Sequence, residues 1–470
     1  MQKTKIIATL GPACENPTTI KKMLHSGLNV FRINASHSQN LKHINKTIKT
    51  IRLESQKLNK SVSIMMDLGG PKIRIALPTT VHKIQITKDN TYRVGFKKYE
   101  IPLNTKIKIS KIHKKATIKV DDGKINFKVL KVEADYIMVC ALNDGEITKN
   151  KGVNFPGLSL KLPAVTNTDK KHIQMAINLG VDWIAQSFVK QPTNIYPIQR
   201  ILSKNNVQIP VIAKIETADA IENLDKILLK YDGILIARGD LGVEMELSGL
   251  PKLQKQIINH CIYHKKPCIV ATQMLESMIT NDTPTRAEVN DVANAIYDGV
   301  DAIMLSAETA IGSYPVQSVE MMSSISSNIE SDLDLSNFNR NIVDSLSSVG
   351  TNNYLAICHA AYSIASDLAI KIIVVLTDSG KTAIQMAQFR PNAIIVAITP
   401  HQKTCNLLSI IWGIMPIYAK QAKDMQDVYG LVNKILITQK VIQPGEHFLI
   451  TSGILKLKNS TNMLQIYQSK

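Results

Sequence analysis

Two carboxylates and a lysine are the residues of this 470-residue chain whose types and spacing most directly suggest chemistry. Lys214 and Glu216 stand two positions apart at the end of an apolar run, so in a strand both side chains would project from the same face. Asp240 follows the next apolar run, and because adjacent strands lie about 4.8 Å apart, the two carboxylates can converge. Two hard oxygen ligands with room for waters and substrate oxygens suit Mg²⁺. The alternative is a salt-bridged network of Lys214, Glu216 and Arg238 without a metal.

Polar side chains also stand at the ends of the other apolar runs. They are Arg32, Asn34, Ser36, Asp67, Ser187, Thr272, Ser306 and Glu308. Charges on otherwise apolar strands are costly to bury unless they bind something, and Arg32 carries a planar fork of donors suited to phosphate or carboxylate. The set predicts an anionic, phosphorylated substrate, a divalent ion, and a lysine directed at developing negative charge.

The apolar runs alternate with amphipathic stretches, which favours parallel strands joined by crossover helices. The expected strands are 4–10, 28–34, 62–68, 181–188, 210–216, 233–239, 267–273 and 301–308. Expected helices include 217–229, 250–264 and 285–297, the last with a Thr285-x-x-Glu288 capping-box pattern. Eight strands, seven of them followed directly by a helix, are typical of a (β/α)8 TIM barrel, whose chemistry lies at the carboxyl ends of its strands.

The third strand–helix unit is interrupted by alternating runs at 105–110 and 116–147, which predict a small antiparallel domain. A third region has strand patterns at 371–377, 393–399, 415–420 and 447–453. We therefore expect an α/β protein, a TIM barrel interrupted by a small β-barrel domain and followed by a C-terminal α/β domain. The predicted domains are 1–67 with 163–340 for the barrel, 68–162 for the inserted domain and 341–470 for the C-terminal domain.

The formal charge of +18 raises the question of a nucleic-acid partner. Only 5% of the residues are aromatic, there is no basic arm, and the lysines are spread along the whole chain, so we expect no nucleic-acid binding. An A+T-rich coding genome would enrich Ile, Asn and Lys in this way, and a positive field would also steer small anionic substrates.

The sequence predicts a cytoplasmic protein without a membrane partner. No apolar run approaches the roughly 18 residues needed to span a bilayer, and Gly11-Pro12 cuts short the apolar start that a signal peptide would need. The six cysteines are scattered without a C-x-x-C pair, which disfavours a zinc site or a disulfide framework and fits a reducing compartment.

Blocks throughout the chain resemble pyruvate kinase. They are TKIIATLGPAC, NVFRINASHS, DLGGPKIR, KGVNFPG, LPAVTNTD, AKIET, ARGDLGVE, ATQMLESM, TRAEVNDVANAIYDG and IMLSAETAIGSYP. The resemblance implies transfer of a phosphoryl group from phosphoenolpyruvate to ADP, giving pyruvate and ATP in the last step of glycolysis, with Mg²⁺ or Mn²⁺. It also implies that the inserted domain is a mobile lid, that the C-terminal domain is regulatory, and that the protein is a homotetramer.

The resemblance assigns roles position by position. Arg32 would bind the phosphate of phosphoenolpyruvate, and Lys214 would stabilise charge on the transferring phosphoryl and the enolate. Glu216 and Asp240 would ligate Mg²⁺, and the backbone of Gly239 and Asp240 would contact the substrate carboxylate.

Further roles carry over with open alternatives. Thr272 would contact the substrate carboxylate, and Thr272 and Ser306 would lie near the place where the enolate is protonated. The nucleotide-side contacts would be Arg74, His37, Lys151 and Asn34. Alternatively, Thr272 fills a barrel layer, His37 caps a helix, and Lys151 is a solvated surface lysine.

Many members of this family require K⁺. The matching oxygens here belong to Asn34, Ser36, Asp67 and the carbonyl of Leu68. Those members carry threonine at position 68 and glutamate in place of Lys72, so this chain resembles the subgroup that works without K⁺. An ammonium near Asp67 would supply the field of a monovalent cation, and K⁺ is predicted not to be required. The alternative is a Lys72 that faces water at a domain hinge.

The stretch TDSGKTAIQMAQFRP at 377–391 resembles a loop that binds sugar-phosphate or nucleotide effectors in some members. Backbone donors of Ser379, Gly380, Lys381 and Thr382 would hold a phosphate at a helix N-terminus. The alternative is an ordinary strand-to-helix turn.

Two other functions compete with this interpretation. A Mg²⁺-dependent barrel lyase or aldolase would share Arg32, Glu216 and Asp240, but it gives no reason for the inserted domain. A basic scaffold or RNA-binding protein would not need the polar strand ends, and all of them are present.

Overall fold

The computed structural model describes residues 2–36, 41–107, 112–114, 116–158, 160, 162–333, 353–420, 425–453 and 461–470. The contacts within it divide the chain into two compact units. The first is Met1–Asp67, Ala176–Ile184 and Ile258–Lys470, and the second is Leu68–Met175 and Ala185–Ile257. The division into three domains remains a prediction, and its boundary at 340 lies outside the described residues.

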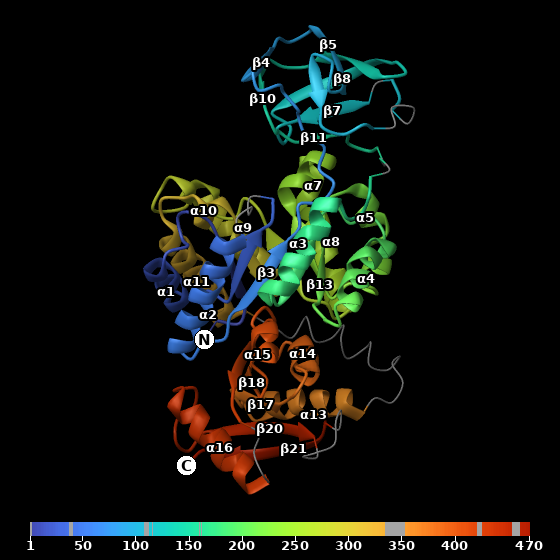
Figure 1. The fold of residues 1–470 in the computed structure, drawn as a ribbon. Coiled ribbons are helices and arrows are strands. Elements are labelled where there is room, and N and C mark those ends of the chain that lie inside the picture. The colour runs from blue at the N-terminus through green and yellow to red at the C-terminus, as the bar shows by residue number, and fades with distance from the viewer. Residues whose placement is uncertain are drawn as a thin grey trace. The chain divides into compact units, whose positions relative to one another are not determined.

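Eight parallel strands form a closed barrel, in the order β1-β16-β15-β14-β13-β12-β3-β2 (Figure 1). They are β1 (Lys5–Thr9), β2 (Val30–Asn34), β3 (Ser63–Asp67), β12 (Trp183–Gln186), β13 (Val211–Ile215), β14 (Gly233–Ala237), β15 (Cys268–Ala271) and β16 (Ala302–Leu305). Most of their residues are buried, as expected for strands covered on both faces. All eight predicted strands are confirmed, each somewhat shorter than its apolar run.

Helices and 3₁₀ turns follow the barrel strands. They are α1 (Pro17–His25), α2 (Leu41–Lys57), α3 (Asn167–Leu179), η2 (Pro192–Ile195), α4 (Tyr196–Lys204), α5 (Ala218–Glu222), α6 (Leu224–Leu228), α7 (Arg238–Glu244), η3 (Leu247–Gly249), α8 (Leu250–Tyr263), η4 (Glu276–Ile279), α9 (Arg286–Tyr297), α10 (Ala307–Ala310) and α11 (Pro315–Asp332). The capping box of Thr285 and Glu288 is confirmed at the start of α9. The single helix predicted at 217–229 is wrong, because α5 and α6 are separated at Asn223, whose amide donates to the Lys190 and Asp219 carbonyls.

The inserted segment folds around one apolar core within the second unit. Its strands are β4 (Lys83–Ile86), β5 (Thr91–Phe96), β6 (Ile101–Leu103), β7 (Thr117–Val120), β8 (Ile125–Val132), β9 (Tyr136–Ala141), β10 (Gly145–Thr148) and β11 (Val153–Asn154). They form a six-stranded sheet, β11-β7-β8-β9-β5-β6, and a two-stranded sheet of β10 and β4. The strand predicted at 105–110 is wrong for 105–107, which form no strand, and 108–110 lie outside the described residues.

The two connections of this insert run side by side. Arg74 and Gly152 form an antiparallel bridge. On either side of it, Ile75 N donates to the Lys151 carbonyl at 2.9 Å and Val153 N to the Ile73 carbonyl at 2.9 Å. The insert therefore leaves and re-enters the chain as one hydrogen-bonded ribbon.

The C-terminal part of the first unit is a five-stranded sheet in the order β19-β18-β17-β20-β21. Its strands are β17 (Ile372–Leu376), β18 (Ile394–Thr399), β19 (Ile414–Tyr418), β20 (His447–Gly453) and β21 (Thr461–Gln468), and its helices are α13 (Asn353–Asp367), α14 (Lys381–Gln388), α15 (Gln402–Leu408) and α16 (Met425–Thr438). The four predicted strands are parallel to one another, while β21 is an antiparallel edge that the sequence patterns missed. The predicted fold class is therefore confirmed. Across the described residues, no helix has both the length and the apolar character needed to cross a membrane.

Candidate functional site

A buried lysine–carboxylate pair lies at the end of β13 in the second unit. Lys214 Nζ is 2.8 Å from Glu216 Oε1 and 2.7 Å from the hydroxyl of Ser187, to which it donates. The other carboxylate oxygen of Glu216 accepts a 2.7 Å hydrogen bond from the backbone N–H of Phe188. Ser187 in turn donates to the Leu68 carbonyl at 2.7 Å. The Lys214 ammonium is thus fixed by an anion on one side and a hydroxyl on the other.

The electrostatics of Glu216 suit a cation site. Burial raises the pKa of Glu216, the charge of Asp240 raises it further, and Lys214 works in the opposite direction. The Oε1 atom is buried and lies 2.8 Å from the Lys214 ammonium. A buried carboxylate that already faces one cation lies in a site that favours positive charge. The charge of Asp240 raises the pKa of Glu216, which agrees with the predicted convergence of the two carboxylates. The ion pair between Lys214 and Glu216, which belongs to the alternative network, is also present.

The donor set at this place fits a divalent ion. Glu216 offers a buried carboxylate, and Asp240 offers a second carboxylate on the first turn of α7. Both are the hard oxygen ligands that Mg²⁺ and Mn²⁺ accept, and the remaining positions would be completed by water or substrate oxygens.

Lys72 points at the second of these carboxylates. Its Nζ lies 2.7 Å from Asp240 Oδ1 and 4.0 Å from Asp122 Oδ1, and 6.0 Å from the centre of the Phe188 ring. Its side chain is only 20% exposed, so the alternative of a lysine that simply faces water does not describe this structure. Proximity of Lys72 to Asp67 remains a prediction.

Two glycines make room for this arrangement. Gly70 has a left-handed backbone with φ +67°, and a Cβ built there would lie 2.9 Å from the Cβ of Ser187. A Cβ on Gly152 would lie 2.7 Å from Cε of Lys72. The stretch DLGGPKIR therefore needs glycine for close packing on Ser187, and the Lys72 side chain passes directly over the backbone of Gly152.

Arg32 is held by neighbours within the first unit. Its Nε and Nη2 lie 2.8 and 2.7 Å from Asp67 Oδ2, and its Nη1 donates to the hydroxyl of Thr9 at 3.0 Å. Asn34 stands opposite Asp67 in the register of β2 and β3 and accepts a hydrogen bond from Ser36 N. The predicted residues at the ends of these two strands are thus brought together.

Thr272 and Ser306 end two other strands of the first unit. Thr272 has φ +72°, an unusual conformation for a β-branched residue, and its hydroxyl donates to the Ala271 carbonyl at 2.5 Å. Ser306 precedes α10, and its N–H donates to Glu308 at 2.6 Å. Burial raises the pKa of Glu308. The role of Thr272 in binding remains a prediction.

Two of the four predicted nucleotide-side residues, Arg74 and Lys151, lie at the root of the insert. Arg74 donates through Nη1 to the Asn150 carbonyl at 2.8 Å, and Lys151 Nζ lies 2.9 Å from Asp121 Oδ1. Burial opposes ionisation of Asp121, but hydrogen bonding and charge from Lys151 outweigh it and lower the pKa of Asp121. Lys151 is thus ion-paired and half-exposed. The third predicted contact, His37, lies outside the described residues.

A cleft of about 710 Å³ opens beside Lys72 within the second unit. Polar and aromatic side chains along its walls include Lys72, Asn154, Phe155, Phe188, Lys190, Asn194, Asp219 and Glu244. Of the lysines and carboxylates described above, Lys72 lines this cleft.

The predicted effector residues lie on one turn in the first unit. Gly380 has φ +83° and precedes α14, and its N–H donates to the hydroxyl of Thr377 at 3.0 Å. Ser379, Lys381 and Thr382 flank it in sequence. Their binding of an effector remains a prediction.

Sequence reasoning missed several residues that position the site. Asp169 accepts from Gly70 N at 3.1 Å and from Thr166 N at 2.8 Å, which fixes the glycine turn. The Thr166-x-x-Asp169 spacing ahead of α3 was the available signal. Lys119 of β7 donates to the Val243 carbonyl at 2.7 Å, a contact for which the sequence carries no signal.

Three comparisons with known proteins agree with one another. The family model described as pyruvate kinase, barrel domain, matches residues 1–319, and that described as pyruvate kinase, alpha/beta domain, matches residues 355–467. Proteins named pyruvate kinase from Staphylococcus saprophyticus and Methylorubrum extorquens are each 36% identical to this chain over 99% of its length, covering 80% and 97% of theirs. The crystal structure of a pyruvate kinase from Cryptosporidium parvum is similar with a TM-score of 0.93 and 30% identity, covering 100% of this chain and 96% of that one.

Proposed function

The chain belongs to the pyruvate kinase family and is a phosphotransferase, and we propose that it transfers the phosphoryl group of phosphoenolpyruvate to ADP with Mg²⁺ or Mn²⁺ and without K⁺. Pyruvate and ATP are the products, and the reaction is the last step of glycolysis in the cytoplasm. The observation that carries the proposal is the buried Lys214 ammonium, fixed between the Glu216 carboxylate and the Ser187 hydroxyl.

The proposed mechanism depends on charge held in place before the reaction. Lys214 faces the charge that develops on the phosphoryl group and the enolate, and it needs no reorganisation because both of its partners already fix it. Arg32, oriented by Asp67 and Thr9, presents its remaining donors to the phosphate. Glu216 and Asp240 would hold the divalent ion, which when bound neutralises charge on the transferring group.

The remaining contacts follow the family pattern. The backbone of Gly239 and Asp240 and the hydroxyl of Thr272 bind the substrate carboxylate, and Thr272 and Ser306 lie near the site of enolate protonation. Arg74, His37, Lys151 and Asn34 are the proposed nucleotide-side contacts. The insert 68–162 closes over the substrates and excludes water that would otherwise accept the phosphoryl group.

Lys72 is the proposed substitute for K⁺. In the working enzyme its ammonium serves the site formed by Asn34, Ser36, Asp67 and the Leu68 carbonyl, so no monovalent ion has to be bound. Its partly buried position and its contact with a site carboxylate support a role in the active site.

Regulation and assembly complete the proposal. The turn at Ser379–Thr382 would bind a sugar-phosphate or nucleotide effector, and the protein would be a homotetramer. No nucleic acid or membrane takes part.

The test is pyruvate formation from phosphoenolpyruvate and ADP with Mg²⁺, with and without K⁺, in buffers whose ionic strength is matched by a bulky organic cation. Equal rates are expected, and Lys72→Glu should then become dependent on K⁺. A large rise with K⁺ in the unmodified enzyme would contradict the role of Lys72 alone. Absence of pyruvate in both buffers would contradict the proposed reaction.

A further inference from the structure

We infer that Lys72 is an internal competitor of the divalent ion: in the metal-free protein its ammonium occupies Asp240, and the ion must displace it to bind. The inference rests on the proposed function only for the identity of the metal ligands. It gives Lys72 a task before the reaction, distinct from any service as a monovalent cation during it.

Each of the two proposed metal ligands has an ammonium beside it. Lys214 neutralises Glu216 at 2.8 Å, and Lys72 neutralises Asp240 at 2.7 Å. Because the two carboxylates act on each other, each needs its own cation while no metal is bound. A divalent ion brings two further positive charges into the same place, so at least one ammonium must withdraw.

The surroundings decide which ammonium withdraws. Lys214 has a second close partner in Ser187, and its side chain is 11% exposed. Lys72 has a single close partner, since its other recorded contacts are Asp122 at 4.0 Å and the Phe188 ring at 6.0 Å, and its side chain is 20% exposed. Displacement of Lys72 breaks only one short ion pair, so the metal displaces Lys72 and leaves Lys214 in place.

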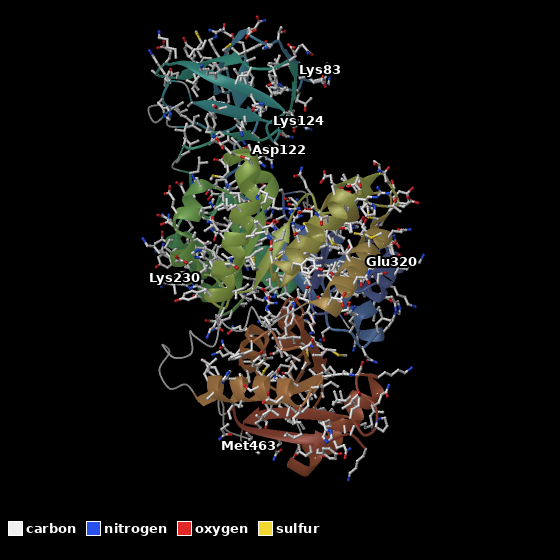
Figure 2. All side chains as sticks on the ribbon, turned by 180° about the vertical axis from the view of Figure 1, so that it is seen from behind. Lys83, Asp122, Lys124, Lys230, Glu320 and Met463 are labelled. Carbon is white, nitrogen blue, oxygen red and sulfur yellow. The ribbon has the colours of Figure 1, made fainter. Side chains whose placement is uncertain are left out.

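The position of Lys72 in the chain makes its release consequential. It follows the Gly69-Gly70-Pro71 turn and directly precedes the ribbon that carries the insert. Asp122 of the insert, labelled in Figure 2, is 67% exposed and lies 4.0 Å from the Lys72 ammonium. Binding of the ion would therefore break the 2.7 Å ion pair between Lys72, at the root of the insert, and Asp240 on α7.

The first experiment titrates Mn²⁺ without phosphoenolpyruvate or ADP and follows free Mn²⁺ by electron paramagnetic resonance. Lys72→Met should bind Mn²⁺ about three- to tenfold more tightly than the unmodified protein, as expected when a competing, partly buried ion pair is removed. Lys190→Met removes a lysine from the same cleft, and Lys83→Met removes one that pairs with Glu146 in the insert (Figure 2). Both controls should bind like the unmodified protein. Equal tightening in Lys72→Met and Lys190→Met would overturn the inference, since a general field effect would then suffice.

The second experiment needs no variant and keeps the test valid if Lys72→Met does not fold. Lysines of the unmodified protein are reductively methylated with and without Mg²⁺, and the modified positions are quantified by mass spectrometry. Mg²⁺ should increase the methylation rate of Lys72 and leave that of Lys83 unchanged. An unchanged rate at Lys72 would show that the ammonium stays on Asp240 and would overturn the inference. Neither readout requires phosphoryl transfer, so failure here is distinct from failure of the proposed function.

Discussion

The end of β13 and the turn before Lys72 each place an ammonium within 3 Å of a carboxylate, at 2.8 and 2.7 Å, yet their surroundings differ. At β13 the pair is buried and the lysine has a hydroxyl as second partner. At the turn the lysine is partly exposed, and the backbone beneath it depends on glycine. The two ion pairs therefore have similar N–O distances but are not equally easy to break. Under our proposals, the first pair stays in place during the reaction and the second exchanges with the metal ion.

The largest expected effect comes from removing the lysine of the buried pair. Lys214→Met leaves the transferring charge without its fixed cation, and kcat for pyruvate formation should fall by about 10³-fold. Lys72→Met, assayed with K⁺ present, should remain within about tenfold of the unmodified enzyme. Equal losses in the two variants, measured on protein with unchanged circular dichroism, would show that the two lysines do the same work.

The glycine turn offers a smaller effect with a matched control. Gly70→Ala meets both a left-handed backbone and a contact at 2.9 Å, so the free energy of unfolding should drop by about 2–3 kcal/mol. Gly157 has a similar φ of +72° with nothing within 4 Å of a built Cβ, so Gly157→Ala should cost only about 1 kcal/mol. Urea unfolding of both variants measures the difference, and equal losses would assign the whole effect to backbone strain.

Ser187→Ala would make Lys214 resemble Lys72, because it removes the second partner at 2.7 Å. We expect kcat to fall about tenfold while KM for ADP changes little, since the ammonium loses orientation and not charge. Steady-state kinetics with varied ADP separates the two constants. A fall confined to KM would contradict an orienting role for Ser187.

Lys60 extends the comparison to a half-buried lysine that donates to a backbone carbonyl. Its Nζ donates to the Leu24 carbonyl at 2.8 Å, and burial lowers the pKa of Lys60 to about 8. Between about pH 8 and the unfolded value of 10.5 the unfolded chain binds more protons, so this lysine destabilises the fold fully at pH 7 and progressively less as pH rises.

Lys60→Met should therefore raise the free energy of unfolding by about 1 kcal/mol at pH 7, and the gain should vanish near pH 11, above the unfolded pKa of 10.5. The Leu24 carbonyl keeps a donor in the variant, because the N–H of Ser26 also reaches it. Chemical unfolding at the two pH values checks the sign. A gain that grows with pH would contradict the assigned direction of the pKa.

Sequence reasoning succeeded where a short repeat or spacing in the sequence determines the local structure. The barrel strands are buried on both faces and read as continuous apolar runs, so all eight could be located. Lys214 and Glu216 follow from the alternation of side chains along a strand, and Thr285 with Glu288 from the fixed spacing of a cap.

It failed where distant segments decide a conformation. The partner of Lys72 depends on the direction of a loop and on a carboxylate 168 positions away, which no local period encodes. The break at Asn223 depends on the Lys190 carbonyl, which belongs to another strand–helix unit. The left-handed backbone at Phe188 and Thr272 contradicts the preference of these residue types, so propensity predicts the opposite.

The paired ribbon formed by Arg74 and Gly152 has a consequence for how such a protein can change over time. Because both connections of the insert are neighbours, a whole domain can be added, lost or exchanged at this point while the ends of the interrupted barrel unit stay where they were. Genetic recombination at the ribbon would exchange one inserted segment for another and leave the barrel strands unchanged. The insert can in this sense be replaced as a unit, and a variant in which a short turn replaces it should still fold its barrel.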